Sequence, residues 1–479
     1  MSSARRLVKN TFSMFVARGL QPFLSLLLAL VIGRTLGPDL FGKYTVIFQL
    51  YFIFQITCSF GMRILLTREV AADKNRVNQY LINGTMLGIP AILVNIGIML
   101  LLIKLMNYDA ETANAAYVIT ISLVASGLAD IFAGVLNGLE EIQKIAYGWI
   151  ILLVVKTFIS IAALLTGYGL MALVVIHVVT KFIQPVLYFY YIANIIDKLK
   201  IIIDTALMKK LLKMAWSLAL LIVCISIFWR IDAIMLSKLS TNEVVGNYGA
   251  AFKIFWVSLL LVKSFFVAFF PMISSMYSEQ NINFQKACRK ALRYLTILII
   301  PIALVSTFFA PHFMLLIWGE KFVGSIVILQ VMIWALLPYA ISEVFGSALV
   351  ASRNQNTHLV LNAVSLIVKI VLNYFLILKF EAVGAAISSI IAIIFLVVIQ
   401  SPFVISRLIR FNFRLLVAPV TKIVVAAAGM TALIFILNNL NFVVAAAVSG
   451  IAYLSILYIL KLVNEEDKKY FNKVVKKTA

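Results

Sequence analysis

Eight charged residues lie deep inside long apolar segments of this 479-residue chain, where a charge is costly and therefore informative. One such charge at the centre of a membrane helix costs about 2.5–3.5 kcal/mol, so it usually faces a water-filled cavity or a charged partner. The five cations are Arg18, Lys156, Arg230, Lys253 and Lys369, and the three acids are Asp130, Asp232 and Glu343. Because guanidinium and ammonium groups bind phosphate oxygens, the excess of cations predicts a cleft for an anionic group such as a phosphate or pyrophosphate. The acids are expected to bind a small cation or to hold the basic side chains in place.

Arg230 and Asp232 are the most informative pair. They are two positions apart, about 200° around a helix, so they cannot share a face. One is expected to face the cavity and the other to pair with a neighbouring helix. Four further cations lie nearer the segment ends and are expected to extend towards the lipid headgroups: Arg63, Lys181, Lys263 and Lys422.

Sequence motifs for catalysis, metal binding or nucleotide binding do not occur. The chain has no Gly-x4-Gly-Lys-Ser/Thr loop for ATP phosphates and no Gly-x-Ser-x-Gly turn for a nucleophilic serine. The three histidines, His177, His312 and His358, are too scattered to suggest a metal site. His177 lies deep in an apolar segment, where a packed neutral imidazole is favoured over a proton relay. We therefore expect no enzyme activity, catalytic residue, metal ligand or cofactor.

The segments that must position the charged residues are long and apolar. Hydrophobic residues make up 63% of the chain and charged residues 13%. In soluble domains about 45–50% of residues are apolar and about 25% are charged, so a water-soluble enzyme or DNA-binding protein is excluded. A membrane helix needs about 20 mainly apolar residues, and fourteen segments fit: 11–33, 44–66, 80–103, 115–136, 146–166, 169–193, 214–236, 248–272, 292–311, 324–350, 358–378, 383–405, 416–438 and 441–461. The sequence thus predicts an all-α polytopic membrane protein whose first helix is retained rather than cleaved as a signal peptide.

The net charge of +22 reflects how lysine and arginine are distributed among the loops. With the N-terminus in the cytoplasm, 26 of the 41 basic residues fall in cytoplasmic segments and six in outer loops. This asymmetry follows the positive-inside rule and predicts that both termini are cytoplasmic. It also argues against nucleic-acid binding, because the basic residues are spread over eight short segments rather than one patch.

The chain resembles itself at an offset of about 204–215 residues. A basic residue follows the first and the seventh spans, eight positions before Gly42 and Gly246, and a Gly-x-Tyr then opens the next span. Further matching pairs are Lys156 with Lys369 and Gly134 with Gly346. Six spans per half give both halves one orientation, as in transporters whose two bundles rock around a central site. The expected domains are a six-helix lobe at 1–205, a second six-helix lobe at 206–414, two additional helices at 415–462 and a basic cytoplasmic tail at 463–479.

Four segments carry a recognisable family pattern within the arrangement of six, six and two spans. They are Arg34-Thr-Leu-Gly37-Pro-Asp-x-x-Gly42-x-Tyr44, Ile231-Asp232…Val245-Gly246-Asn-Tyr248-x-Ala-Ala251-x-Lys253, Leu316-Ile-Trp-Gly319-Glu-Lys-Phe and Asn373-Tyr-Phe-Leu-Ile-Leu-Lys-Phe-Glu-Ala-Val-Gly384-Ala-Ala. Over about residues 5–460 the chain resembles the Wzx-type O-antigen and capsule flippases. These form a branch of the multidrug/oligosaccharidyl-lipid/polysaccharide exporter (MOP) superfamily. One position departs from the family: Glu381 stands where glycine is usual, and this is expected to alter the outer loop between the eleventh and twelfth spans.

The resemblance implies inversion of undecaprenyl-pyrophosphate-linked oligosaccharide across the bacterial inner membrane by alternating access. The implied partners are this lipid-linked oligosaccharide, membrane lipids, a coupling H+ or Na+, and a polysaccharide polymerase with its chain-length regulator. Two alternatives stay open: a lipid II flippase, and a cation-coupled multidrug exporter, whose cavity should be acidic because typical drugs are cationic. A membrane-embedded glycan polymerase is disfavoured because no outer loop exceeds about a dozen residues.

Overall fold

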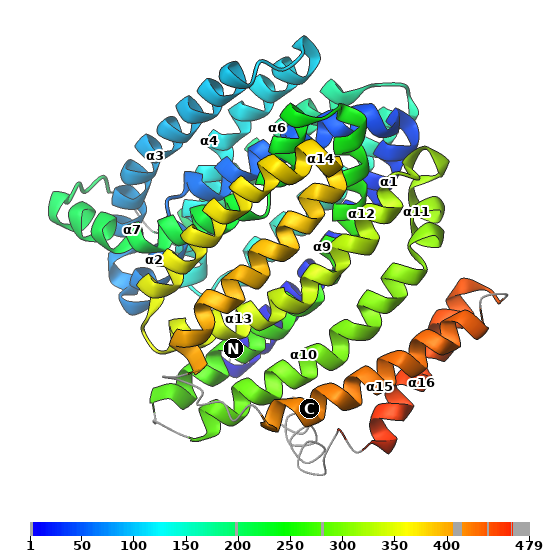
Figure 1. Cartoon of the computed structure of the whole chain (residues 1–479). Helices are drawn as coiled ribbons and strands as arrows, with labels where there is room; N and C mark the ends of the chain where they lie inside the picture. The colour runs from blue at the N-terminus through cyan, green and yellow to red at the C-terminus, as the bar shows by residue number, and fades with distance from the viewer. Residues whose placement is uncertain are drawn as a thin grey trace. The chain divides into compact units, whose positions relative to one another are not determined.

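The structure, a computed structural model, describes residues 3–196, 200–278, 282–405, 414–437, 440–460 and 462. Side chains are described from residue 20 onwards, apart from those at 215, 217–218, 268, 278, 282–283 and 414–419. The elements are α1 Ser3–Cys58, α2 Met62–Ala72, η1 Lys74–Arg76, α3 Val77–Met106, α4 Ala110–Gly138, α5 Ile142–Leu165, α6 Leu170–Ala193, α7 Thr205–Phe228, α8 Ile231–Leu239, α9 Asn242–Ser278, α10 Ile282–Phe308, α11 Ala310–Trp318, η2 Glu320–Phe322, α12 Ser325–Met332, η3 Ile333–Ala335, α13 Leu336–Ala351, α14 Gln355–Val404, α15 Arg414–Ile436 and α16 Phe442–Ile459. Helices account for every element in the described ranges, so the expected all-α polytopic fold is confirmed (Figure 1).

In the described part of the chain, ten helices are long and apolar enough to cross a membrane, or eleven if the bent helix α7 is counted. This number is lower than fourteen partly because two long helices each contain two of the expected spans. α1 is interrupted at Gly37, where φ is 76°, and α14 at Glu381, where φ is 47°. The expected span 44–66 is wrong in one respect, because left-handed Phe60 and Gly61 separate α1 from α2.

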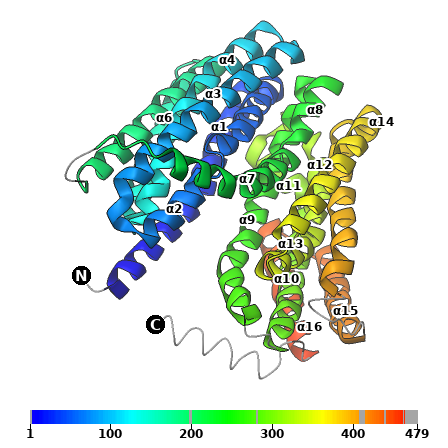
Figure 2. The same cartoon turned by 90° about the vertical axis from the view of Figure 1, so that its left-hand side faces the viewer.

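The described chain divides into two compact units, of which unit 1 comprises Met1–Ala250 and Leu366–Ala385. Within unit 1, α4 packs against α2, α3 and α6, and α1 packs against α5. Figure 2 shows α1, α3, α4 and α6 running side by side. Small residues on α4 permit this packing, since a Cβ on Gly127 would come within 2.4 Å of Ile92. Buried apolar side chains of α2, α3, α4, α5, α6 and α7 form one core.

The two repeated loop segments at 34–44 and 238–248 pack directly on each other within unit 1. A Cβ on Gly42 would lie 1.9 Å from the carbonyl oxygen of Asn242, and a Cβ on Gly246 would lie 2.0 Å from that of Pro38. Neither distance is sterically possible, so glycine is required at both positions for the two backbones to touch. The repeat found in the sequence thus corresponds to a physical contact.

Unit 2 comprises Ala251–Ser365 and Ala386–Ala479, of which 463–479, the expected basic tail, lies outside the described residues. In this unit α10 packs against α13 and α15, and α15 packs against α16. The hydroxyl of Tyr453 on α16 donates to the carbonyl of Ile297 on α10 at 3.2 Å, inside a core of apolar side chains. The expected lobe boundaries at 205 and 414 stay a prediction.

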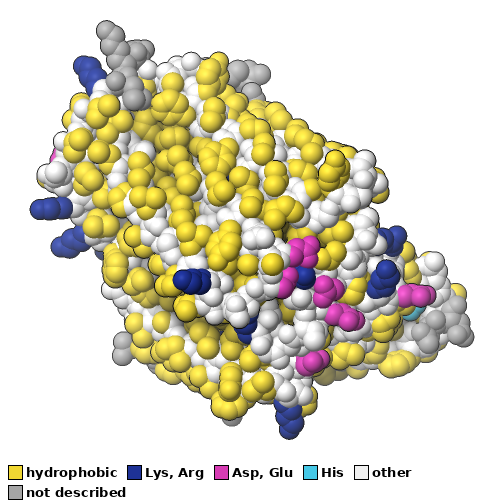
Figure 3. All heavy atoms as spheres, turned by 90° about the horizontal axis from the view of Figure 1, so that it is seen from above, with side chains coloured by type: hydrophobic (Ala, Val, Ile, Leu, Met, Phe, Trp, Pro, Cys, Tyr) yellow, Lys and Arg dark blue, Asp and Glu magenta, His cyan; other side chains and the backbone are white. Residues whose placement is uncertain are grey.

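Large hydrophobic side chains are exposed along many of these helices, including Leu93, Val186 and Ile451. Figure 3 shows one face of the molecule on which hydrophobic side chains extend over most of the surface, whereas charged side chains gather in a few places. Such a surface is unfavourable in water and suits contact with lipid chains.

Candidate functional site

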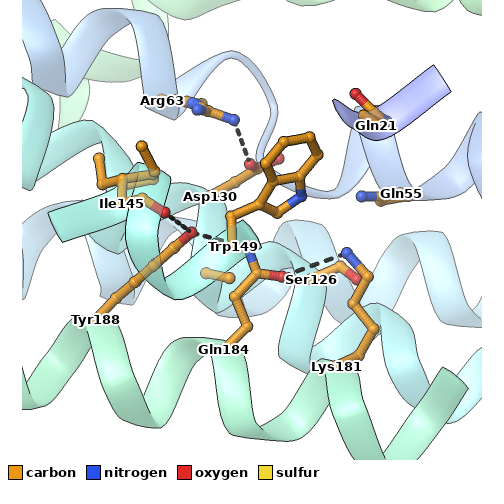
Figure 4. A pocket seen from close by; sticks show the side chains of 13 residues that line it. Gln21, Gln55, Arg63, Ser126, Asp130, Ile145, Trp149, Lys181, Gln184 and Tyr188 are labelled. Atoms are coloured by element: carbon orange, nitrogen blue, oxygen red, sulfur yellow. Dashed lines mark hydrogen bonds and ion pairs between the residues drawn. The ribbon is translucent and has the colours of Figure 1, made fainter. Parts of the chain in front are cut away.

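A polar pocket of about 240 Å³ lies inside unit 1. It is surrounded by α1, α2, α4, α5 and α6, which Figure 4 shows around the labelled side chains. The lining residues are Gln21, Gln55, Arg63, Ser126, Ala129, Asp130, Ala133, Ile145, Ala146, Trp149, Lys181, Gln184 and Tyr188. More than half of them carry a polar or charged group.

An ion pair between α2 and α4 forms one wall of the pocket. Arg63 Nη1 donates to Asp130 Oδ1 at 3.1 Å. Arg63 stands in the first turn of α2 because the chain turns at Gly61, where φ is 74°. A Cβ on Gly134, one turn after Asp130, would lie 2.8 Å from the carbonyl oxygen of Arg63. Two glycines therefore place the guanidinium against the carboxylate.

Lys181 supplies a second cation from the opposite wall, on α6. Its Nζ donates to Gln184 Oε1 at 3.3 Å, and Gln184 Nε2 donates to the hydroxyl of Tyr188 at 3.0 Å. The same hydroxyl donates to the carbonyl of Ile145 on α5 at 3.4 Å. Because Gln184 and Tyr188 follow Lys181 by three and seven positions, all three lie on one face of α6.

Neutral polar groups complete the pocket. Gln21 and Gln55 come from α1, and Figure 4 shows the indole of Trp149 on α5 close to them and to Asp130. Ser126 is within 2.7 Å of the hydroxyl of buried Tyr51, so its position is fixed from behind the pocket wall. Amides donate and accept hydrogen bonds, and an indole offers an apolar face with an N–H donor, which together suit a polar organic ligand.

Two cations facing one acid leave the pocket with a formal excess of one positive charge. The expectation that Arg63 and Lys181 extend to the lipid headgroups is therefore wrong, because both side chains line the pocket. A signal for them existed in the sequence: Asp130 inside an apolar span requires a cationic partner. The broken helix at Gly61, which places Arg63 opposite Asp130, was not visible in the hydrophobic pattern.

Asp232 and Lys369 are brought together in a second, fully buried cluster of unit 1. Lys369 Nζ lies 2.9 Å from Asp232 Oδ2, and the exposed fractions of the two side chains are 0% and 3%. Tyr248 donates to the same oxygen at 2.7 Å, and Asn373 donates to Oδ1 at 2.8 Å. Lys369 also donates to the carbonyl of Phe228 and lies over its ring. The expected substrate-binding role of Lys369 stays a prediction, since the structure places this lysine in an ion pair without exposure.

Arg230 and Lys156 have other partners in the same unit. Arg230 Nη1 donates to Gln49 Oε1 on α1 at 2.7 Å, and Asp232 pairs with Lys369 on α14, so both residues have partners on other helices. That one of the two faces a cavity stays a prediction. Lys156 Nζ lies 2.8 Å from Nδ1 of the buried His177. Their expected roles in binding an anion stay predictions.

The remaining candidates are not brought into this pocket. Lys253 on α9 and Glu343 on α13 belong to unit 2, where both are half-buried. Glu343 accepts from Tyr339, one turn earlier, and interacts electrostatically with Lys263. The backbone of Arg18 belongs to α1, whereas its side chain lies outside the described residues.

Comparisons with known families give a direct match. The family described as polysaccharide biosynthesis protein matches residues 7–277, more than half of the chain, and the family described as MatE matches residues 217–375. The capsular polysaccharide biosynthesis protein CapF of Staphylococcus aureus is 22% identical over 388 residues, which cover 80% of this chain and 95% of CapF. The longer family match and the CapF relative are thus both described as polysaccharide biosynthesis proteins.

Solved structures share the fold. A lipid II flippase MurJ in an inward closed conformation matches with a TM-score of 0.74 and 18% identity, covering 94% of this chain and 98% of that one. An inward-facing multidrug resistance MATE transporter matches with a TM-score of 0.65 and 14% identity, covering 81% and 96%. A transporter from Pyrococcus furiosus, described as having a binding pocket of reverse polarity, matches with a TM-score of 0.59 and 14% identity, covering 83% and 94%. The chain belongs to the polysaccharide biosynthesis protein family and has the fold of the MOP-superfamily transporters.

Proposed function

We propose that the protein flips oligosaccharide units linked to undecaprenyl pyrophosphate across the bacterial inner membrane, for the synthesis of surface polysaccharide. Both termini are cytoplasmic in this proposal. Translocation proceeds by alternating access and is coupled to H+ or Na+. A polysaccharide polymerase with its chain-length regulator takes up the product on the outer side.

The pocket of unit 1 is the observation that carries the proposal. A pyrophosphate diester is doubly negative and bears a polar glycan, so its carrier needs cations beside neutral hydrogen-bonding groups in a site that lipid does not fill. Arg63 and Lys181 provide the cations, and Gln21, Gln55 and Trp149 provide the neutral groups. Arginine and lysine differ usefully here, because guanidinium binds two phosphate oxygens in a fork and ammonium acts as a point charge.

Charge also separates this proposal from drug export. A site for cationic drugs should contain an excess of acids, whereas Asp130 faces two cations in this pocket. The shared fold with a multidrug resistance transporter does not by itself decide the cargo, because one fold hosts many functions. The sign of the pocket favours an anion.

Replacing the two pocket cations by glutamine tests the proposal in a strain that depends on this gene. The R63Q/K181Q variant should insert normally and fail to support surface polysaccharide. R68Q is the matched control, because Arg68 lies on the same helix α2 with its side chain 62% exposed and should be dispensable. Normal surface polysaccharide in the double variant would overturn the proposal. Drug resistance that depends on Asp130 would instead establish an exporter of cations.

A further inference from the structure

Asp130 forms an ion pair with Arg63, the residue whose guanidinium would bind a phosphate group of the ligand. Arg63 donates to the carboxylate through Nη1, and Lys181 is close enough to act on it electrostatically. Both members of the ion pair stay open to the pocket, since the side chain of Arg63 is 42% exposed and that of Asp130 is 24% exposed. A ligand entering the pocket therefore meets an arginine that already holds an anion.

The remaining Arg63 donors have no other partner among the side chains that the structure describes. A guanidinium has five N–H donors in one plane, and its strongest contact with phosphate uses two of them in parallel. Nη1 donates to Asp130, so a phosphate that binds the end of the guanidinium through Nη1 and Nη2 competes with the carboxylate for Nη1. In that binding mode Asp130 and the ligand compete for the same nitrogen atom.

Charge leads to the same conclusion. With Asp130 ionised and in place, the pocket has a formal excess of one positive charge, which matches a singly negative group. With Asp130 displaced from Arg63, both cations face the pocket, which matches a doubly negative diphosphate. Like charges placed close together in a poorly hydrated site repel strongly, so an ionised Asp130 disfavours each additional negative charge on the ligand.

We propose that Asp130 is a built-in counter-ion which the diphosphate headgroup displaces from Arg63 on binding and which reclaims Arg63 on release. This inference rests on the proposed function and assigns Asp130 a specific task in it. Asp130 holds the guanidinium in the pocket while no headgroup is bound. It also weakens headgroup binding enough for the ligand to leave, which a transporter needs at each cycle.

Binding measurements on the purified full-length protein in nanodiscs test this task. Farnesyl diphosphate, a monoester that is more negative than a pyrophosphate diester, is the probe, and farnesyl monophosphate is the probe of lower charge. The D130N variant should bind the diphosphate about tenfold more tightly than the wild type, with a smaller gain for the monophosphate. D130E is the matched control, because it keeps the charge and should bind the diphosphate like the wild type. Unchanged or weaker diphosphate binding by D130N, or an equal gain for both probes, would overturn the inference.

Two further variants separate failure of the inference from failure of the proposed function. R63Q and K181Q should each weaken binding of the diphosphate. If they do and D130N gives no gain, the anion site stands and the counter-ion role of Asp130 is refuted. If neither variant changes diphosphate binding, the pocket is not the headgroup site, and both the proposed function and the inference are overturned. Should D130N not fold, D130S removes the same charge and serves the same comparison.

Discussion

Breaking the buried ion pair of Asp232 and Lys369 should destabilise the protein more than removing both charges together. Replacing Lys369 by methionine keeps the length of the side chain and leaves the Asp232 carboxylate without its cation. Replacing Asp232 by asparagine leaves the ammonium of Lys369 without an anionic partner, with neutral acceptors such as the carbonyl of Phe228 in its place. Each single variant therefore places one unpaired charge in the interior.

The magnitude follows from how completely the pair is buried. With side-chain exposed fractions of 0% and 3%, water cannot solvate the charge left behind. Breaking such a pair costs about 3–5 kcal/mol, whereas replacing both partners by neutral groups of similar volume is often close to neutral. Tyr248 and Asn373 still donate to Asp232 after loss of Lys369, so K369M should fall at the lower end of that range. The D232N/K369M variant should recover most of the loss.

The structural role of the pair is tested by measuring thermal unfolding of the purified variants and the amount of surface polysaccharide in cells that express them. K379M is the matched control, because Lys379 is an exposed lysine on the same helix α14 and should change stability by about 0.5 kcal/mol or less. Additive losses in the double variant, or single losses below about 1 kcal/mol, would refute the structural role. A double variant that is stable but cannot export polysaccharide would show that Lys369 acts on the substrate, as its position in the repeat predicts.

Two further substitutions test local features of unit 1. Glu381 has a φ of 47°, a conformation that costs a non-glycine residue about 1 kcal/mol, so E381G should raise the unfolding temperature although it loses a hydrogen bond from Ser240. E381A loses the same hydrogen bond but keeps a side chain at this backbone conformation, so its strain is not relieved. Equal unfolding temperatures of E381G and E381A would show that the backbone at this position is not strained. Burial raises the pKa of Asp109, but hydrogen bonds from Thr112 and Lys43 outweigh it and leave this pKa below its ordinary value. As the pH falls from about 5 to about 3, the wild type should therefore lose more stability than D109N. The difference should be well under 1 kcal/mol because Asp109 is half exposed. Parallel curves of unfolding temperature against pH for the two proteins would refute this prediction.

Hydrophobic pattern was sufficient to predict the helical class and the position of most helices, because lipid requires long apolar segments with internally satisfied backbones. It could not predict where a helix breaks without losing its apolar composition. The turn at Phe60 and Gly61 is such a case, since both residues are compatible with a continuous span. The same limit applies to Glu381, where sequence pointed to an altered loop and the structure has a single left-handed residue within α14.

Depth within a segment was a poor guide to which charges share a site. The sequence places Arg63 and Lys181 near the ends of their apolar segments, yet both side chains line the pocket with Asp130. Lys369 lies deep in its segment as predicted, but its charge is matched by Asp232, which precedes it by 137 residues. Partner choice depends on how helices pack, and a single sequence does not contain that information.

The internal repeat was the most informative sequence feature, because it identified positions where only glycine permits a close contact between helices. Gly134 and Gly346 occupy matching places, and each is needed for a close approach: Gly134 lies against the backbone of Arg63, and Gly346 lies against the ring of His358. An acid precedes each glycine by about one turn, Asp130 in unit 1 and Glu343 in unit 2. A glycine one turn after an acid lets a neighbouring element come close to the helix that carries the acid. In unit 1 that element is α2, and the close approach allowed by Gly134 places Arg63 against the carboxylate of Asp130 beside the pocket.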